Sequence, residues 1–152
     1  MRAGQVARWW ACEPYSVLVA CGHGVDCVEL PLTPTSHRIL GPLREAGLCP
    51  PAMHTPVGTL VLFVRTPTTT PQPSMLVSVS LRSTGLWVAV PPTGHHGGAG
   101  PGYRWVVNGA PEHLSWQLPE LRPVCEVITA TVQAGWRQRS TRSLGRHPGR
   151  RG

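Results

Sequence analysis

Short apolar segments separated by turn residues dominate the first two thirds of the chain. The segments 16–20 and 25–30 flank two glycines, which predicts a β-hairpin. Segments 52–56 and 59–65 are predicted to be strands on either side of Val57-Gly58. Three further strands are predicted over 75–81, 86–90 and 103–107, the first two forming a hairpin that turns at residues 82–85.

Two segments have apolar residues at helical spacing. In residues 36–46, Thr35-Ser36 can cap the helix and Gly47 can end it, and Ile39, Leu40, Leu43 and Ala46 share one face. Residues 118–138 give the strongest helical pattern, whose apolar face consists of Leu121, Val124, Cys125, Ile128 and Val132. The element order predicts an α+β fold, with a mostly antiparallel sheet and flanking helices.

Charge divides the 152-residue chain into two parts. The net charge is +7, and every positive side chain other than histidine is an arginine. Residues 1–136 hold nearly equal numbers of arginines and acids, whereas residues 137–152 hold six arginines and no acid. We therefore expect one domain over 1–136 and a disordered, Arg-rich tail over 137–152, which would attract phosphates by charge.

Neither a membrane span nor a secretory signal is expected. No apolar run reaches the roughly 18 residues that a membrane helix needs, and Glu13 and Pro14 interrupt the N-terminal segment. We expect a cytoplasmic protein without a disulfide framework. The five cysteines include Cys21 and Cys27 around His23, but a second pair of ligands for zinc is missing. The cysteines are therefore expected to be small buried side chains.

Three segments resemble those of bifunctional DNA primase/polymerase (prim-pol) domains. Residues 79–105, VSLRSTGLWVAVPPTGHHGGAGPGYRW, are similar to the family pattern V-D-I-R-G-D-G-G-Y-V-V-A-P-P-S, a His/Gly loop and Y-x-W. Residues 55–63, TPVGTLVLF, resemble T-P-S-G-G-x-H-L-Y-F, and residues 25–29, VDCVE, resemble the first acidic strand. The three segments keep the family's order over about residues 15–110.

The resemblance implies an archaeo-eukaryotic-primase-like fold and a metal-dependent reaction that joins nucleotides on a DNA template. It implies acids from the first strand and from the V-D-I-R strand as metal ligands. It also implies a histidine from the S-G-G-x-H strand, in contact with the incoming nucleotide.

This chain departs from the family pattern at the residues that carry the chemistry. Asp26 and Glu29 are three positions apart, so that a regular strand directs them to opposite faces unless a bulge intervenes. The acid of V-D-I-R falls on Ser80, and the histidine falls on Leu60 or Val61. No acid occurs between residues 45 and 112. We expect Asp26 and Glu29 to be vestigial and the protein to hold neither metal nor cofactor.

Basic residues supply the candidate nucleic-acid contacts. The central strands carry arginines with no acid nearby in sequence, the Gly-rich loop carries a histidine, and the tail begins with arginines. These candidates are Arg65, Arg82, Arg104, His95, Arg137, Arg139 and Arg142. Trp87, Tyr103 and Trp105 could stack on bases, or they could belong to the sheet core.

The sequence therefore predicts a prim-pol-like domain that has lost catalysis and binds DNA, RNA or an unidentified protein partner. Two alternatives remain open. One is an active, divergent primase/polymerase that uses Asp26 or Glu29 with Mg²⁺ or Mn²⁺. The other is a structural or regulatory protein that binds no nucleic acid.

Overall fold

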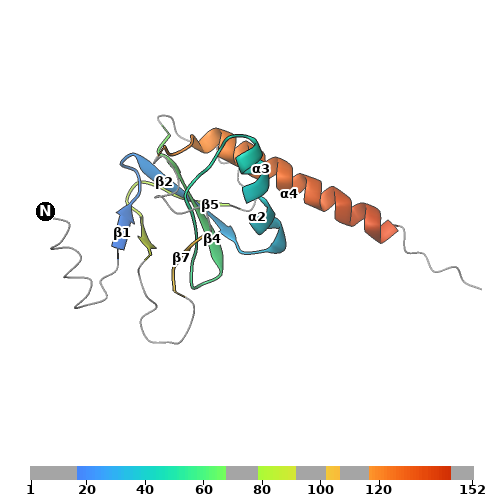
Figure 1. Cartoon of the computed structure of the whole chain (residues 1–152), viewed down its shortest axis with the longest axis horizontal. Coiled ribbons are helices and arrows are strands. Elements are labelled where there is room, and N and C mark those ends of the chain that lie inside the picture. The colour runs from blue at the N-terminus through green and yellow to red at the C-terminus, as the bar shows by residue number, and fades with distance from the viewer. Residues whose placement is uncertain (1–16, 68–78, 92–101, 107–116, 145–152) are drawn as a thin grey trace, which may run out of the picture.

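The computed structural model describes residues 17–67, 79–91, 102–106 and 117–144 (Figure 1). Its strands are β1 (Val17–Ala20), β2 (Val25–Pro31), β3 (Ala52–His54), β4 (Thr59–Arg65), β5 (Ser80–Arg82), β6 (Trp87–Val90) and β7 (Arg104–Trp105). Its helices are α2 (Pro34–Arg38), α3 (Leu40–Glu45) and α4 (Leu121–Leu144). The predicted α+β class is confirmed.

The strands form two antiparallel sheets. Five strands are arranged in the order β5-β2-β4-β3-β7, and β1 pairs with β6 in a separate two-stranded sheet. Both predicted hairpins across 16–30 and 75–90 are therefore wrong, because β1 does not pair with β2 and β5 does not pair with β6. For the first hairpin the physical reason is that β4 and β5 already occupy both edges of β2, so β1 pairs with β6 instead.

The chain crosses between the two sheets at two turns that lie against each other. Gly22 and Gly24 adopt positive φ angles of 92° and 99° in the first turn. The N–H of Cys21 donates to the carbonyl of Leu86 (2.9 Å), which joins this turn to the one that follows β5. Glycine is required at such angles because a Cβ atom clashes there with the backbone.

The predicted helix over 36–46 is divided into α2 and α3. Pro42 lacks the N–H that would bond to the carbonyl of Arg38, so that one continuous helix cannot form. Thr33, rather than Thr35-Ser36, caps α2: its hydroxyl accepts from the N–H of Ser36 at 3.1 Å. Gly47 follows α3 at a positive φ, as predicted.

Helix α4 extends beyond its predicted end at residue 138. Leu121, Val124, Cys125 and Ile128 are buried, which confirms the predicted apolar face. The helix continues to Leu144, so it includes residues 137–144 of the predicted Arg-rich tail. Figure 1 shows the C-terminal part of α4 extending away from the sheet. Residues 145–152 lie outside the described residues.

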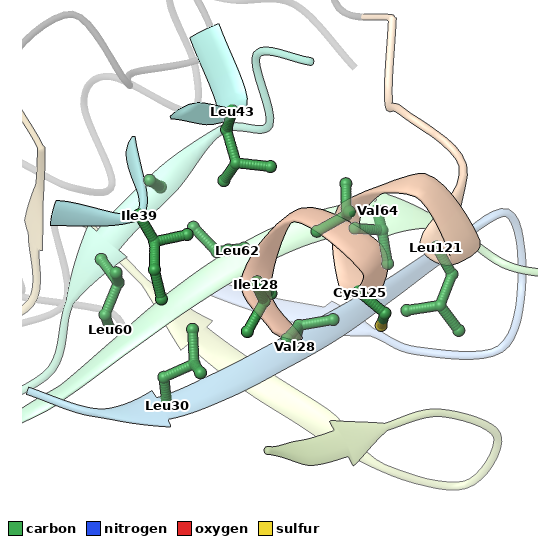
Figure 2. Close-up of a cluster of buried hydrophobic side chains, with 12 residues drawn as sticks. Val28, Leu30, Ile39, Leu43, Leu60, Leu62, Val64, Leu121, Cys125 and Ile128 are labelled. Atoms are coloured by element: carbon green, nitrogen blue, oxygen red, sulfur yellow. The ribbon is translucent and has the colours of Figure 1, made fainter. Parts of the chain in front are cut away.

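Hydrophobic cores cover both faces of the five-stranded sheet. On one face, alternate residues of β2 and β4 pack against the helices (Figure 2). This helix-side core contains Val28, Leu30, Ile39, Leu43, Ala52, Leu60, Leu62, Val64, Leu121, Val124, Cys125 and Ile128. On the other face, the second core contains Cys21, Cys27, Met53, Val61, Phe63 and Val90, with partly buried side chains of β1 and β6 packed against it.

The crossing turns give a testable pair of substitutions. Gly22→Ala would place its Cβ 2.5 Å from the Cα of Thr84, whereas Gly24→Ala meets no atom within 4 Å. Both substitutions carry the cost of a positive φ, so that Gly24→Ala is the matched control. We expect Gly22→Ala to lower the free energy of unfolding by about 2 kcal/mol more than Gly24→Ala in urea denaturation. Equal losses would show that the two turns do not constrain each other.

Candidate functional site

One row of residues crosses the sheet at Glu29. On β5, Ser80 is the partner of Glu29, and on β4 its partner is Val61. Directly opposed residues of neighbouring strands project from the same face of a sheet. Glu29 therefore shares its face with Val61 and the second core. This row is the candidate site.

Asp26 lies on the opposite face. Its partner on β4 is Val64, which belongs to the helix-side core. The pairing of β2 with β4 runs without interruption from Val25↔Arg65 to Pro31↔Thr59, so there is no bulge to rotate one acid toward the other. The prediction that Asp26 and Glu29 point to opposite faces is confirmed.

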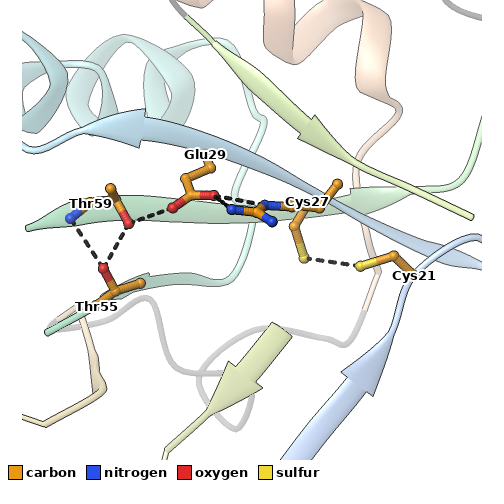
Figure 3. Close-up of polar contacts among 6 residues, drawn as sticks. Cys21, Cys27, Glu29, Thr55 and Thr59 are labelled. Atoms are coloured by element: carbon orange, nitrogen blue, oxygen red, sulfur yellow. Dashed lines mark hydrogen bonds and ion pairs between the residues drawn. The ribbon is translucent and has the colours of Figure 1, made fainter. Parts of the chain in front are cut away.

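The carboxylate of Glu29 is engaged through both oxygens (Figure 3). Oε1 accepts from the hydroxyl of Thr59 at 2.9 Å, and Oε2 accepts from Arg82 through Nε at 2.9 Å and Nη2 at 2.8 Å. The hydroxyls of Thr55 and Thr59 are 2.7 Å apart and extend the network. The side chain of Glu29 is only 16% exposed. A charge-assisted pair of this kind holds the carboxylate in one orientation.

Asp26, near the start of β2, joins three loop segments through its carboxylate. Its Oδ1 accepts from the N–H of Gly22 at 2.8 Å and from the hydroxyl of Thr66 at 3.1 Å. Its Oδ2 accepts from the hydroxyl of Ser83 at 2.8 Å. The side chain is fully buried. Asp26 therefore has a structural role that sequence reasoning missed, since nothing in the spacing links it to Thr66 or Ser83.

The donor set does not fit a pair of divalent cations. Two-metal chemistry needs several hard oxygen ligands on one face, chiefly carboxylates. The row at Glu29 offers one carboxylate, already bonded to Arg82, beside a serine and a valine. Across residues 17–67, 79–91, 102–106 and 117–144, no three His, Cys, Asp or Glu side chains are grouped so that they could hold a metal ion.

The cysteines resemble core side chains more than reactive groups. Cys21, Cys27 and Cys125 are buried, as predicted, whereas Cys49 is exposed. The sulfur atoms of Cys21 and Cys27 are 3.9 Å apart and not bonded in a disulfide. Burial raises the pKa of Cys125 to about 11 and also raises that of Cys27, so both stay as thiols at neutral pH. Cys12 lies outside the described residues.

Two of the three predicted sheet arginines form ion pairs. Arg65 contacts Glu120 at 3.0 Å, and Arg82 contacts Glu29. Both acids are far from their arginine partners in sequence. The search for acids near each arginine in the sequence therefore did not predict these two ion pairs. Arg104 instead lines a cavity on the helix side of the sheet.

The other predicted binding residues are distributed as follows. Arg137, Arg139 and Arg142 all lie in α4, and His95 lies outside the described residues. Among the aromatic candidates, Tyr103 and Trp105 pack against the second core, and the Trp105 ring lies 5.7 Å from that of Phe63. Trp87 is 62% exposed.

Comparison with known proteins identifies the family. The family described as bifunctional DNA primase/polymerase, N-terminal (Prim-Pol), matches residues 2–123. The chain belongs to the Prim-Pol family. No curated protein and no solved structure gives a match. In the part of the chain that the structure describes, no helix of this Prim-Pol domain is long and apolar enough to cross a membrane.

The row at Glu29 unites the positions that differ from the family pattern. The Prim-Pol resemblance implies an acid at Ser80 and a histidine at Leu60 or Val61. In the sheet, Ser80 and Val61 are the two direct neighbours of Glu29. Where the resemblance implies an acid and a histidine, this Prim-Pol domain has Ser80 and an apolar residue, Leu60 or Val61.

The network around Asp26 gives a stability prediction. Asp26→Ala leaves three donors of the crossing loops without their acceptor, and each buried unsatisfied group costs about 1–3 kcal/mol. We expect a loss of about 3 kcal/mol or more in the free energy of unfolding, measured by urea denaturation. Glu126→Ala, which removes an exposed acid of α4, is the control and should change it by less than about 0.5 kcal/mol. A stable Asp26→Ala variant would contradict the structural role.

Proposed function

We propose that this Prim-Pol domain has lost nucleotidyl transfer and acts as a nucleic-acid-binding module. The observation that carries the proposal is the composition of the row at Glu29. Its single carboxylate is bonded to Arg82 and Thr59, and its neighbours are Ser80 and Val61.

Charge balance within the row supports the loss of catalysis. For Glu29 to bind a cation, it would have to give up the contact with Arg82, and the guanidinium would then repel the incoming metal. Asp26 cannot replace a missing ligand, because it lies on the other face and holds three hydrogen bonds there. A second metal would find no carboxylate ligand among the residues of the row.

Positive charge and an exposed ring support nucleic-acid binding. The arginines beyond residue 136 account for most of the net charge of +7, and α4 carries the first three of them away from the sheet. Trp87, on β6 of the two-stranded sheet, is exposed, which suits stacking on unpaired bases. Phosphates and bases are the chemical groups that such side chains recognise.

Primer extension separates the proposal from an active polymerase. We expect no template-dependent nucleotide incorporation above background with Mg²⁺ or Mn²⁺, because the row provides only one carboxylate. Glu29→Ala is the matched variant and should behave like the wild-type chain. Incorporation by the wild-type chain that Glu29→Ala abolishes would establish the alternative, an active Prim-Pol enzyme.

The salt dependence of DNA binding tests the second half of the proposal. Replacing the six arginines of residues 137–152 by glutamine should weaken binding and reduce the slope of log K against log salt by up to about 5. Arg65→Gln is the control, since Glu120 already neutralises that arginine, and should change the slope by less than about 1. Absence of measurable DNA or RNA binding at low salt would favour a structural or regulatory protein.

A further inference from the structure

A cavity of about 520 Å³ lies between the helices and the edge of the sheet. His37 of α2, together with Gly41 and Arg44 of α3, lines one side, and His54 of β3 and Arg104 of β7 line the other. His54 is the register partner of Leu60, a residue of the helix-side core. The cavity is therefore on the opposite face of the sheet from Glu29.

Among the described residues, the lining of the cavity carries positive charge and no acidic side chain. The eight described lining residues include two arginines and two histidines. The ion pairs of the described residues involve Arg65 and Arg82, so that neither Arg44 nor Arg104 is neutralised by one within this part of the chain. Both arginines are exposed, so solvent screens much of their mutual repulsion, and they are open to an anion that would offset the rest.

His54 is affected by the excess of positive charge at the cavity. Its Nε2 is buried and finds no hydrogen-bond partner in the described part of the chain. The rings of His37 and His54 are 5.8 Å apart. Burial, followed by the charges of His37 and Arg104, lowers the pKa of His54, because each of them opposes a further positive charge. A buried polar atom without a partner is costly, and an acceptor group at this wall would relieve that cost.

We propose that this cavity binds the phosphate group of a small organic phosphate, with a mononucleotide as the representative ligand. Two guanidinium groups and two imidazoles provide several N–H donors. A phosphate group has more acceptor oxygens than a carboxylate group, so it can accept from more of these donors at once. The volume is in the range of small-molecule sites, and Leu40 and Val106 offer apolar walls for the uncharged part of the ligand.

This inference is independent of the proposed loss of catalysis. The site shares no residue with the row at Glu29, so failure of either proposal leaves the other standing. It also differs from strand binding by the α4 arginines, because Arg44 and Arg104 lie at the cavity and not on that helix.

Isothermal titration of the full chain tests the site with four probes: adenosine monophosphate, inorganic phosphate, adenosine and a single-stranded oligonucleotide. We expect the monophosphate to bind, inorganic phosphate to bind more weakly and adenosine not to bind. An oligonucleotide that displaces the monophosphate identifies a strand phosphate as the source. An oligonucleotide that does not displace it identifies the free nucleotide.

Three variants and one control locate the binding. Arg44→Gln and Arg104→Gln should each weaken monophosphate binding at least tenfold. Gly41→Leu should abolish it by filling the cavity, and circular dichroism of this variant checks that it folds; no atom lies within 4 Å of the added Cβ. Arg38→Gln removes an exposed arginine of α2 that does not line the cavity, and should leave the affinity unchanged.

Nuclear magnetic resonance of His54 adds a readout that folding defects would not mimic. Saturation with the monophosphate should raise the pKa of His54, because the bound anion favours the imidazolium. No monophosphate or phosphate binding at millimolar concentration would overturn the proposal. Binding that is unaffected by Arg44→Gln, Arg104→Gln and Gly41→Leu would overturn it as well.

Discussion

The uninterrupted pairing of β2 with β4 determines where both acids of β2 point. Successive side chains of a strand point to opposite faces of the sheet. The seven consecutive pairs of β2 with β4 contain no bulge that could turn two residues of opposite direction to the same face. Asp26 is thereby committed to the helix side and Glu29 to the other face. Both edges and both faces of β2 are covered, so this strand cannot shift its register without unpairing the centre of the fold.

The fold does not depend on the groups that Prim-Pol chemistry would need. Val61 is buried in the second core, where an apolar side chain contributes more to stability than a histidine would. Glu29 is held by an arginine and a threonine, a combination that satisfies the carboxylate without a metal ion. The sheet is stabilised by cores on both of its faces, and its stability therefore does not require a metal site.

Local patterns in the sequence predicted the elements better than their partners. The apolar periodicity located β2, β4 and the buried face of α4, because burial of one face produces a regular spacing of apolar residues along the element. The pairing of β1 with β6 was not predicted. Two glycines in a turn are compatible both with a hairpin in one sheet and with a crossing to another sheet, so the sequence does not distinguish the two. Pro42 and Thr33 are local signals for the division of the helix and for its cap, because proline lacks an N–H and threonine caps helices through its hydroxyl.

Within the candidate site, too, the features set by nearby residues were predicted and the long-range contacts were not. The opposed directions of Asp26 and Glu29 follow from counting residues, and the missing acid at Ser80 follows from the resemblance. The contacts of Asp26 with Thr66 and Ser83, and of Arg65 with Glu120, join positions that are 40 to 57 residues apart. Such contacts depend on how the sheets are assembled, for which a single sequence holds no local signal.

The length of α4 has a geometric consequence. At a rise of about 1.5 Å per residue, the eight residues from 137 to 144 carry the chain roughly 12 Å past the last turns that face the sheet. That distance corresponds to about three or four base steps of a stacked strand. For the nucleic-acid binding proposed above, the consequence is a contact region on α4 that lies outside the footprint of the sheet and is displaced from it by that distance.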